Sequence, residues 1–250
     1  MTTYFIIVFF IFGTVFGSFF NVVGLRVPKG ISFHSDRSYC PTCNEQLRAF
    51  ELIPIVSYIF QRGKCRHCKS HISFIYPLIE LFTGLLFAYA FIHFGFTLEL
   101  ITAILFISML MILFVTDLSY MLIPNKILLF FSPLLLVMRI LSPLHPWYDM
   151  LIGASVGFVV LSAIILVSKG GINDDDMKLF VVLGIVLGWK ATLFTLFLAA
   201  LLGTIIGGGI MLIQKADRKQ PIPFGPYIIV AALLSYFYGE QIISMYISLF

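Results

Sequence analysis

Apolar residues in this chain come in long unbroken runs, and short polar segments separate them. A helix needs about 20 apolar residues to cross the ~30 Å of hydrocarbon in a bilayer. The runs are continuous rather than alternating, which favours helices over a barrel. We identify eight runs, at about 4–25, 77–95, 98–116, 124–142, 149–168, 178–188, 190–213 and 226–248. The pattern predicts an all-α, polytopic membrane protein of about eight transmembrane helices, of which the short sixth has the weakest support.

The composition excludes a water-soluble globular protein. Hydrophobic residues make up 60% and charged residues only 11% of the 250-residue chain, whereas a soluble domain is about a quarter charged. The first run has no basic segment before it and is long enough to span. We therefore expect a retained helix there rather than a cleaved signal peptide.

The basic residues predict an orientation in the membrane. The polar stretch 26–76 carries half of all Lys and Arg. If this stretch is cytoplasmic, eight alternating spans place fourteen of the sixteen basic residues on that side and leave only Arg139 and Lys190 outside. Cytoplasmic loops are enriched in Lys and Arg. We therefore expect a multi-pass protein with its first loop in the cytoplasm, and the net charge of +4 does not indicate a nucleic-acid partner.

All four cysteines lie in that loop, as two C-x2-C pairs separated by 21 residues: Cys40, Cys43, Cys65 and Cys68. Each pair can supply two corners of a tetrahedron from one tight turn, so the spacing is typical of a zinc site. The alternative is two disulfides, which a reducing compartment disfavours. Four thiolates fill the coordination of zinc, so the metal would be structural.

Acidic residues at the ends of the apolar runs are candidates for catalysis. Asp117 follows the third run and Asp174 to Asp176 precede the sixth, so the predicted topology places both groups at the cytoplasmic face. Two adjacent carboxylates can share one proton, hold a water and attack a peptide carbonyl. The residues alone leave open the alternative of solvated loop acids, because carboxylates at an interface are tolerated. We expect Glu99, Asp149 and Glu240, at the opposite face, to be solvated.

A series of short motifs runs through nearly the whole chain. They are Gly17-Ser-Phe-Phe-Asn21, the two cysteine pairs, Glu51-Leu-Ile-Pro54, Tyr76-Pro-Leu-Ile-Glu80, Asp117 with Ile123-Pro124-Asn125, Gly170-Gly171 with Asp176-Met-Lys178-Leu179, and Pro223-Phe-Gly-Pro226. In order and spacing the series resembles the bacterial type IV prepilin peptidases, most closely the competence-associated members of Gram-positive bacteria. The resemblance implies an intramembrane aspartic endopeptidase of the bacterial cell membrane, with Asp117 and Asp176 as its catalytic residues.

The resemblance also implies substrates and cofactors. The family cuts the leader from prepilin or pseudopilin precursors at a Gly-Phe type junction, and many members then N-methylate the new amino terminus with S-adenosylmethionine. Methylation is associated with the zinc-bearing loop. We expect the Glu51–Pro54 stretch of that loop to support it, together with Glu80, just after the loop, as a cofactor-binding residue. The chain then divides into a first helix (1–25), a cytoplasmic zinc-binding loop (26–76) and a transmembrane peptidase domain (77–250).

The chain departs from the family pattern just before the second aspartate. Asn173, Asp174 and Asp175 stand where the family has a glycine-rich stretch. Glycine permits positive φ and a close backbone approach, and extra negative charge opposes ionisation of a neighbouring carboxylate. The alternatives are a peptidase without methyltransferase activity, a catalytically impaired homologue, and a non-catalytic scaffold or transporter. A transporter should bury ionisable groups near the bilayer middle, which the apolar runs do not clearly do.

Overall fold

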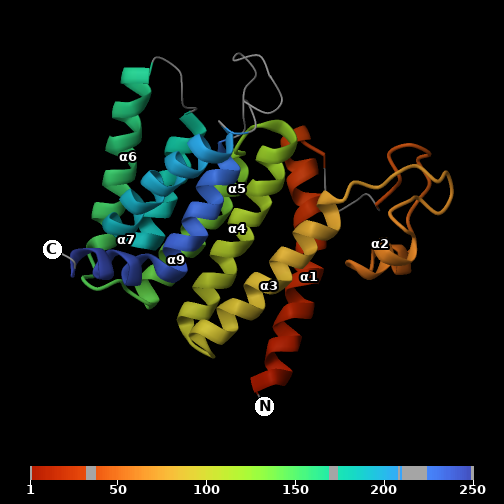
Figure 1. Ribbon diagram of the computed structural model, residues 1–250, viewed down its shortest axis with the longest axis horizontal. Helices are drawn as coiled ribbons and strands as arrows, with labels where there is room; N and C mark the ends of the chain where they lie inside the picture. The colour runs from red at the N-terminus through yellow and green to blue at the C-terminus, as the bar shows by residue number, and fades with distance from the viewer. Residues whose placement is uncertain (1, 32–37, 169–173, 208, 210–223, 249–250) are drawn as a thin grey trace. The chain divides into compact units, whose positions relative to one another are not determined.

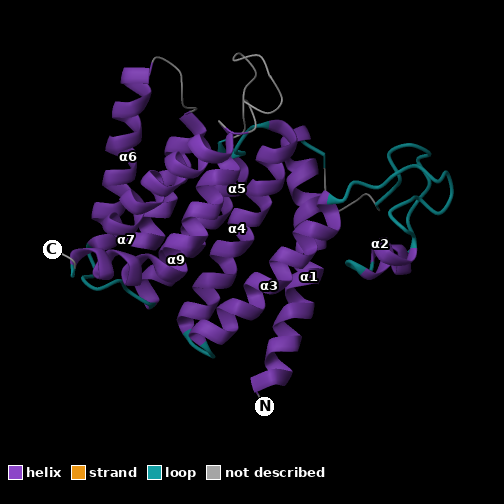
Figure 2. Cartoon of the chain, in the orientation of Figure 1, coloured by secondary structure: helices purple, strands orange, loops and turns teal. Residues whose placement is uncertain are grey.

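The computed structural model describes residues 2–31, 38–168, 174–207, 209 and 224–248. Within them the chain is helical, and the only strand-like pairings are two isolated β-bridges in the cysteine loop (Figure 2). The elements are α1 (Thr2–Arg26), η1 (Val27–Lys29), η2 (Ala49–Leu52), α2 (Val56–Phe60), α3 (Ile75–Phe94), α4 (Leu98–Tyr120), α5 (Asn125–Leu141), α6 (Asp149–Ser168), α7 (Asp174–Leu202), η3 (Gly203–Gly207) and α9 (Gly225–Ile247) (Figure 1). The predicted all-α architecture is confirmed.

Six helical segments of the described chain are long and apolar enough to cross a membrane. They contain α1, α3, α4, α6, α7 and α9. The predicted count of about eight is not confirmed. Helix α5 has 17 residues, or about 26 Å at 1.5 Å per residue, which is at the lower limit of the length that a crossing helix needs. The runs predicted at 178–188 and 190–213 are not two separate helices. The first run and the beginning of the second lie on one element, α7.

Helix α7 is interrupted at Gly188, whose φ of 77° and ψ of 172° are not helical. The backbone N–H of Trp189 donates to the Asp149 carboxylate, and a Cβ on Gly188 would overlap Asp149 Oδ2. Nε of the buried Arg139 donates to the carbonyl of Val186 over 2.9 Å. Asp149, which we expected to be a solvated end, is partly exposed, and its carboxylate also accepts the backbone N–H that follows the break in α7.

The chain divides into two compact units, Met1–Val115 and Thr116–Phe250. In the first unit α1 and α3 pack along each other (Figure 1). Their contact uses small residues, since a Cβ on Gly13 would lie 2.7 Å from the carbonyl oxygen of Thr83, and one on Gly84 would lie 2.7 Å from Thr14 Cγ2. Small residues let transmembrane helices approach closely. This pair of helices forms the base from which the cysteine loop extends.

The second unit is organised around α7, which packs against α5, α6 and α9. Gly153 of α6 and Gly184 of α7 are so close that a Cβ on either one would overlap the backbone of the other. Phe180, Leu183 and Val186 of α7 are completely buried. The first half of α7 is therefore fixed in the core, and its N-terminal turn carries the acidic residues Asp174 to Asp176.

Candidate functional site

The four cysteines form one cluster in the first unit. Their sulfur atoms all lie within 4.8 Å of one another, and Cys40 Sγ is 3.8 Å from Cys68 Sγ. The cysteines are free rather than disulfide-bonded. Zn–S bonds of about 2.3 Å place tetrahedral sulfur ligands about 3.8 Å apart, so the residues present fit zinc. The predicted pairing of the two C-x2-C motifs in space is confirmed.

Both C-x2-C turns have the same backbone design. In each, the first cysteine N–H donates to the carbonyl five residues on, and the residue four positions on donates back to that cysteine's carbonyl. That fourth residue has positive φ in both turns, 56° at Asn44 and 61° at Lys69. Successive N–H groups then point at the sulfur. The N–H groups of Cys43 and Thr42 lower the pKa of the Cys40 thiol to about 6, which favours the thiolate that binds metal.

A hydrogen bond in the first unit connects Glu80 of α3 to the cysteine loop. Glu80 lies on α3 and is 8% exposed, and its Oε2 accepts a 2.7 Å hydrogen bond from the N–H of Ile55. Ser18 of α1 also hydrogen-bonds its carboxylate. Ile55 has φ 62° and ψ −50°, which is an outlier for a β-branched residue. Glu80 therefore fixes a strained turn directly after the Glu51–Pro54 stretch.

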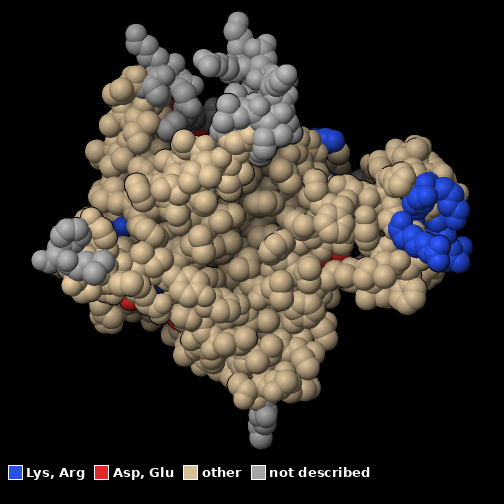
Figure 3. All heavy atoms as spheres, viewed as in Figure 1, with Lys and Arg blue, Asp and Glu red and all other residues tan. Residues whose placement is uncertain are grey.

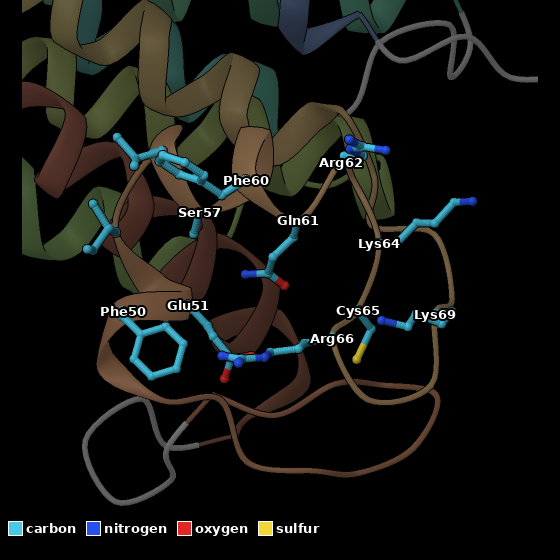
Figure 4. A pocket seen from close by; sticks show the side chains of 12 residues that line it. Phe50, Glu51, Ser57, Phe60, Gln61, Arg62, Lys64, Cys65, Arg66 and Lys69 are labelled. Atoms are coloured by element: carbon cyan, nitrogen blue, oxygen red, sulfur yellow. The ribbon is translucent and has the colours of Figure 1, made fainter.

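The cysteine loop encloses a hollow of about 770 Å³ (Figure 4). Its lining combines apolar side chains from η2 and α2 with basic side chains from the second cysteine turn. The lining residues are Phe50, Glu51, Ile53, Val56, Ser57, Phe60, Gln61, Arg62, Lys64, Cys65, Arg66 and Lys69. Glu51 is buried and accepts the N–H of Arg48 over 2.8 Å, which closes the first turn of η2. This hollow lies in the predicted methyltransferase region.

Asp117 lies in the last turn of α4 and is 6% exposed. The backbone N–H of Gly225 donates to its carboxylate. A Cβ on Gly225 would lie only 2.6 Å from Asp117 Cγ and Oδ2. Within the described residues Oδ2 has no hydrogen-bond partner. A buried polar atom without a partner is unfavourable, as in a site built to hold a water or a substrate group.

The three aspartates that begin α7 differ in their surroundings. Asp176 is 7% exposed, whereas Asp175 is half-buried and Asp174 is exposed. Asp175 forms an ion pair of 2.8 Å with Lys178, one turn further along the helix. All three lie at a helix N-terminus, which favours negative charge. Burial thus distinguishes Asp176 from its two neighbours.

Four helix ends meet at one end of the second unit. Lys178 Nζ donates to Asn125 Oδ1 over 3.0 Å, which joins the starts of α5 and α7. The contact between Gly225 and Asp117 joins the start of α9 to the end of α4. The structure therefore places Asp117 and Asp176 at the same end of this unit. Arg139 and Asp149, which contact the break in α7, lie at the other end of α5 and at the start of α6.

Sequence reasoning did not identify the contacts of Gly225 with Asp117 or of Ile55 with Glu80. Both join residues far apart in the chain, and only their membership of short motifs could have indicated them. Some predicted positions lie outside the described residues, namely Gly170, Gly171, Asn173 and Pro223.

Comparisons with known proteins agree on one family. A family model for the bacterial peptidase A24 N-terminal domain matches residues 11–94, and the model of the type IV leader peptidase family matches residues 104–208. The chain is 47% identical to the prepilin leader peptidase/N-methyltransferase of Bacillus subtilis over 240 residues, which cover 96% of this chain and 97% of that protein. It is 32% identical to the protein of that name from Stutzerimonas stutzeri, over 95% of this chain and 92% of the relative. No solved structure matches.

Proposed function

This chain belongs to the type IV leader peptidase family, and we propose that it is an intramembrane aspartic endopeptidase that cuts the leader from type IV prepilin-like precursors at a Gly-Phe type junction. One observation carries the proposal: Asp117 and Asp176 are both buried, and each lies at a helix end on the same end of the second unit. Buried carboxylates are rare unless they are paired or functional.

In the proposed mechanism Asp117 and Asp176 share one proton. The ionised carboxylate removes a proton from a water molecule, whose oxygen attacks the carbonyl carbon of the glycine at the cut. The protonated carboxyl donates to the carbonyl oxygen as negative charge develops there. The tetrahedral intermediate then collapses. The C–N bond breaks as the departing amine takes the proton that the first carboxylate removed from water, and the re-forming carbonyl returns the other proton to the second carboxylate. The N–H of Gly225 holds the Asp117 carboxylate in a fixed direction. Fixed orientation of reacting groups accounts for a large part of the rate acceleration by enzymes.

We propose that this end of the second unit faces the cytoplasm, as does the first loop. Lys126 and Lys178 lie at the starts of α5 and α7, the same end as Asp117. Arg139 and Lys190 lie near the break in α7, at the opposite end. These four residues are balanced, two at each end. The asymmetry that the positive-inside rule needs comes from Lys169, Lys215, Arg218 and Lys219, which the sequence has between α6 and α7 and before α9. A basic leader would then meet the acidic first turn of α7.

The departure from the family's glycine-rich stretch does not argue strongly against activity. Asp175, the residue immediately before Asp176, is ion-paired with Lys178, so its charge is locally balanced. Asp174 is exposed, and water screens it. Excess charge at Asp174 and Asp175 is therefore not a reason to expect impaired catalysis. Only a change in backbone conformation at these positions would support the alternative of an impaired homologue.

We further propose that the chain N-methylates the new amino terminus with S-adenosylmethionine, which supplies the methyl group. Cys40, Cys43, Cys65 and Cys68 would hold one zinc ion that fixes the fold of the loop. Glu80 would support the activity as a positioning residue, since its hydrogen bond to Ile55 fixes the turn after Glu51–Pro54. The alternative is a peptidase whose zinc loop has only a structural role.

The test is incubation of the purified full chain with a prepilin-type precursor and S-adenosylmethionine, followed by mass measurement of the product. We expect loss of the leader and gain of one methyl group on the new amino terminus. Cleavage without methylation would favour the single-activity alternative. An intact precursor, under conditions where the Bacillus subtilis relative cleaves it, would contradict the proposed function.

A further inference from the structure

The cysteine loop exposes large apolar side chains beside a cluster of positive charge. Phe60 is 84% exposed, and Phe50, Ile53 and Val56 are each 44% to 47% exposed. The basic side chains opposite them, Arg62, Lys64, Arg66 and Lys69, are also exposed. These eight residues all line the hollow of the loop. We name this set of eight the amphipathic face.

The attachment of the loop sets the depth of this face relative to the bilayer. The N–H of Ile55 binds Glu80, which is the sixth residue of α3, a helix long and apolar enough to span. At 1.5 Å per residue, Glu80 lies about 7.5 Å along α3 from its first residue. Phe74 and Tyr76, at the start of α3, are exposed aromatic residues, and these concentrate at the membrane–water interface. The hydrogen bond of Ile55 therefore holds the segment from Ile53 to Val56 beside the first two turns of α3, the end of the helix that carries the exposed aromatic residues.

The charge on this face is of one sign. Figure 3 shows Lys and Arg side chains gathered over the cysteine-bearing segment. Glu51 is the only acidic residue among those described as lining the hollow. It is 7% exposed, and its Oε2 accepts the backbone N–H of Arg48, whereas its Oε1 has no hydrogen-bond partner among the described residues. Arg66 lies 5.4 Å above the ring of Phe50, so the apolar and basic parts of the face adjoin. Exposed apolar side chains beside several cations are typical of segments that lie in a bilayer interface.

We propose that the amphipathic face docks on anionic phospholipids of the bilayer that holds the chain. Phe60 and its apolar neighbours insert between the lipids, while Arg62, Lys64, Arg66 and Lys69 contact the phosphates. Each Lys or Arg near an anionic surface strengthens association by about fivefold. The basic leader of a precursor is the wrong charge for this face, which favours lipid over substrate as its occupant. This inference concerns the loop and does not depend on the peptidase mechanism.

The test uses the full chain in nanodiscs and a tryptophan at the tip of the face. The chain has two tryptophans, so Trp147→Phe and Trp189→Phe give a silent background for Phe60→Trp. Brominated phosphatidylglycerol and brominated phosphatidylcholine nanodiscs report contact with lipid, and acrylamide reports contact with water. Tyr39→Trp in the same background is the matched control, because Tyr39 is exposed on the loop but does not line the hollow.

We expect bromolipid to quench the tryptophan introduced by Phe60→Trp more strongly in phosphatidylglycerol than in phosphatidylcholine, and high salt to reduce the difference. The Tyr39→Trp control should show no such preference. Replacing Arg62, Lys64, Arg66 and Lys69 by Gln should remove the lipid dependence while zinc content and precursor cleavage are retained.

Equal quenching in both lipids would overturn the proposal, as would quenching by acrylamide alone. Protection of the introduced tryptophan that develops only when precursor is added would overturn it in favour of a substrate site. A preference for phosphatidylglycerol that survives neutralisation of the four basic residues would also overturn it. The two lipids are compared in the Phe60→Trp protein, which keeps all four basic residues. This comparison therefore tests the proposal even if the protein with the four Gln substitutions loses its zinc.

Discussion

Gly225 lies directly against the carboxylate of Asp117. Its N–H donates to that carboxylate, and the space where a Cβ would stand is 2.6 Å from Asp117 Oδ2. The two residues are far apart in the chain, yet each is part of a short motif. The contact gives the Phe224-Gly-Pro226 turn a function beyond starting α9, namely to fix the direction of a carboxylate at the end of α4.

Gly225→Ala should therefore damage cleavage. The added methyl group has to displace either Asp117 or the start of α9, and a placement error of ~1 Å near a reacting group can reduce the rate by ~100-fold. The measurement is cleavage of a precursor in membranes at matched expression. Gly239→Ala is the control on the same helix, because its Cβ would make an ordinary contact of 3.6 Å with Ala191. Equal activity of the two variants would contradict the assigned role.

Asp175→Gly should keep or raise activity. The pair with Lys178 is on the surface, and such pairs contribute about 0–1 kcal/mol. Glycine is also the residue that the resemblance to the family leads us to expect at this position. The measurement is the cleavage rate of Asp175→Gly beside Asp174→Gly and the parent. A dead Asp175→Gly enzyme with a normal Asp176→Asn enzyme would show that the catalytic position is one residue earlier.

The zinc site should affect the loop and leave the membrane helices intact. We expect one zinc per chain in protein purified without chelators, and Cys40→Ser with Cys65→Ser should abolish it. Structural zinc supplies folding free energy to small domains. Hydrogen exchange should therefore quicken in 38–72 after metal removal, while α1 and α3 stay protected. A zinc content near zero, or exchange that quickens equally in α3, would argue against this site.

Glu80 should influence methylation more than cleavage. Glu80→Ala leaves the N–H of Ile55 without its acceptor, which costs about 1–3 kcal/mol when the group stays buried, and the turn after Pro54 should relax. Glu80→Gln keeps an acceptor, so its effect should be smaller. The exposed Glu45→Gln is the control in the same loop. Assays of both products on each variant decide the point, and lost cleavage with retained methylation would contradict the assignment.

The sequence indicated the helices and the cysteine cluster because both depend on local information. An apolar run specifies a spanning helix wherever it packs, as at α3 and α4, and a C-x2-C turn presents two sulfurs by its own backbone geometry. The pairing of Cys40 with Cys68 in space then follows from the metal chemistry that the spacing indicates. The general position of Asp117 and Asp176 at one end of the helices could likewise be deduced from the order of the spans.

The rest depends on contacts that hydropathy does not encode. The break at Gly188 lies inside an apolar stretch, and the side chains of Arg139 and Asp149 from other helices stabilise it. For the same reason the sequence did not indicate the hydrogen bond that the Asp149 carboxylate accepts. The sequence could not show whether α5 crosses the membrane, because its 17 residues are near the limit between a crossing helix and a shorter one. The number of spans was therefore not predictable.

Replacement of each carboxylate by its amide tests whether Asp117 and Asp176 form the catalytic pair. Asp117→Asn and Asp176→Asn keep the size of the side chain and remove its acid–base function. At expression and zinc content equal to the parent, precursor cleavage followed by mass measurement should find no product from either variant. Normal cleavage by either one would contradict the account.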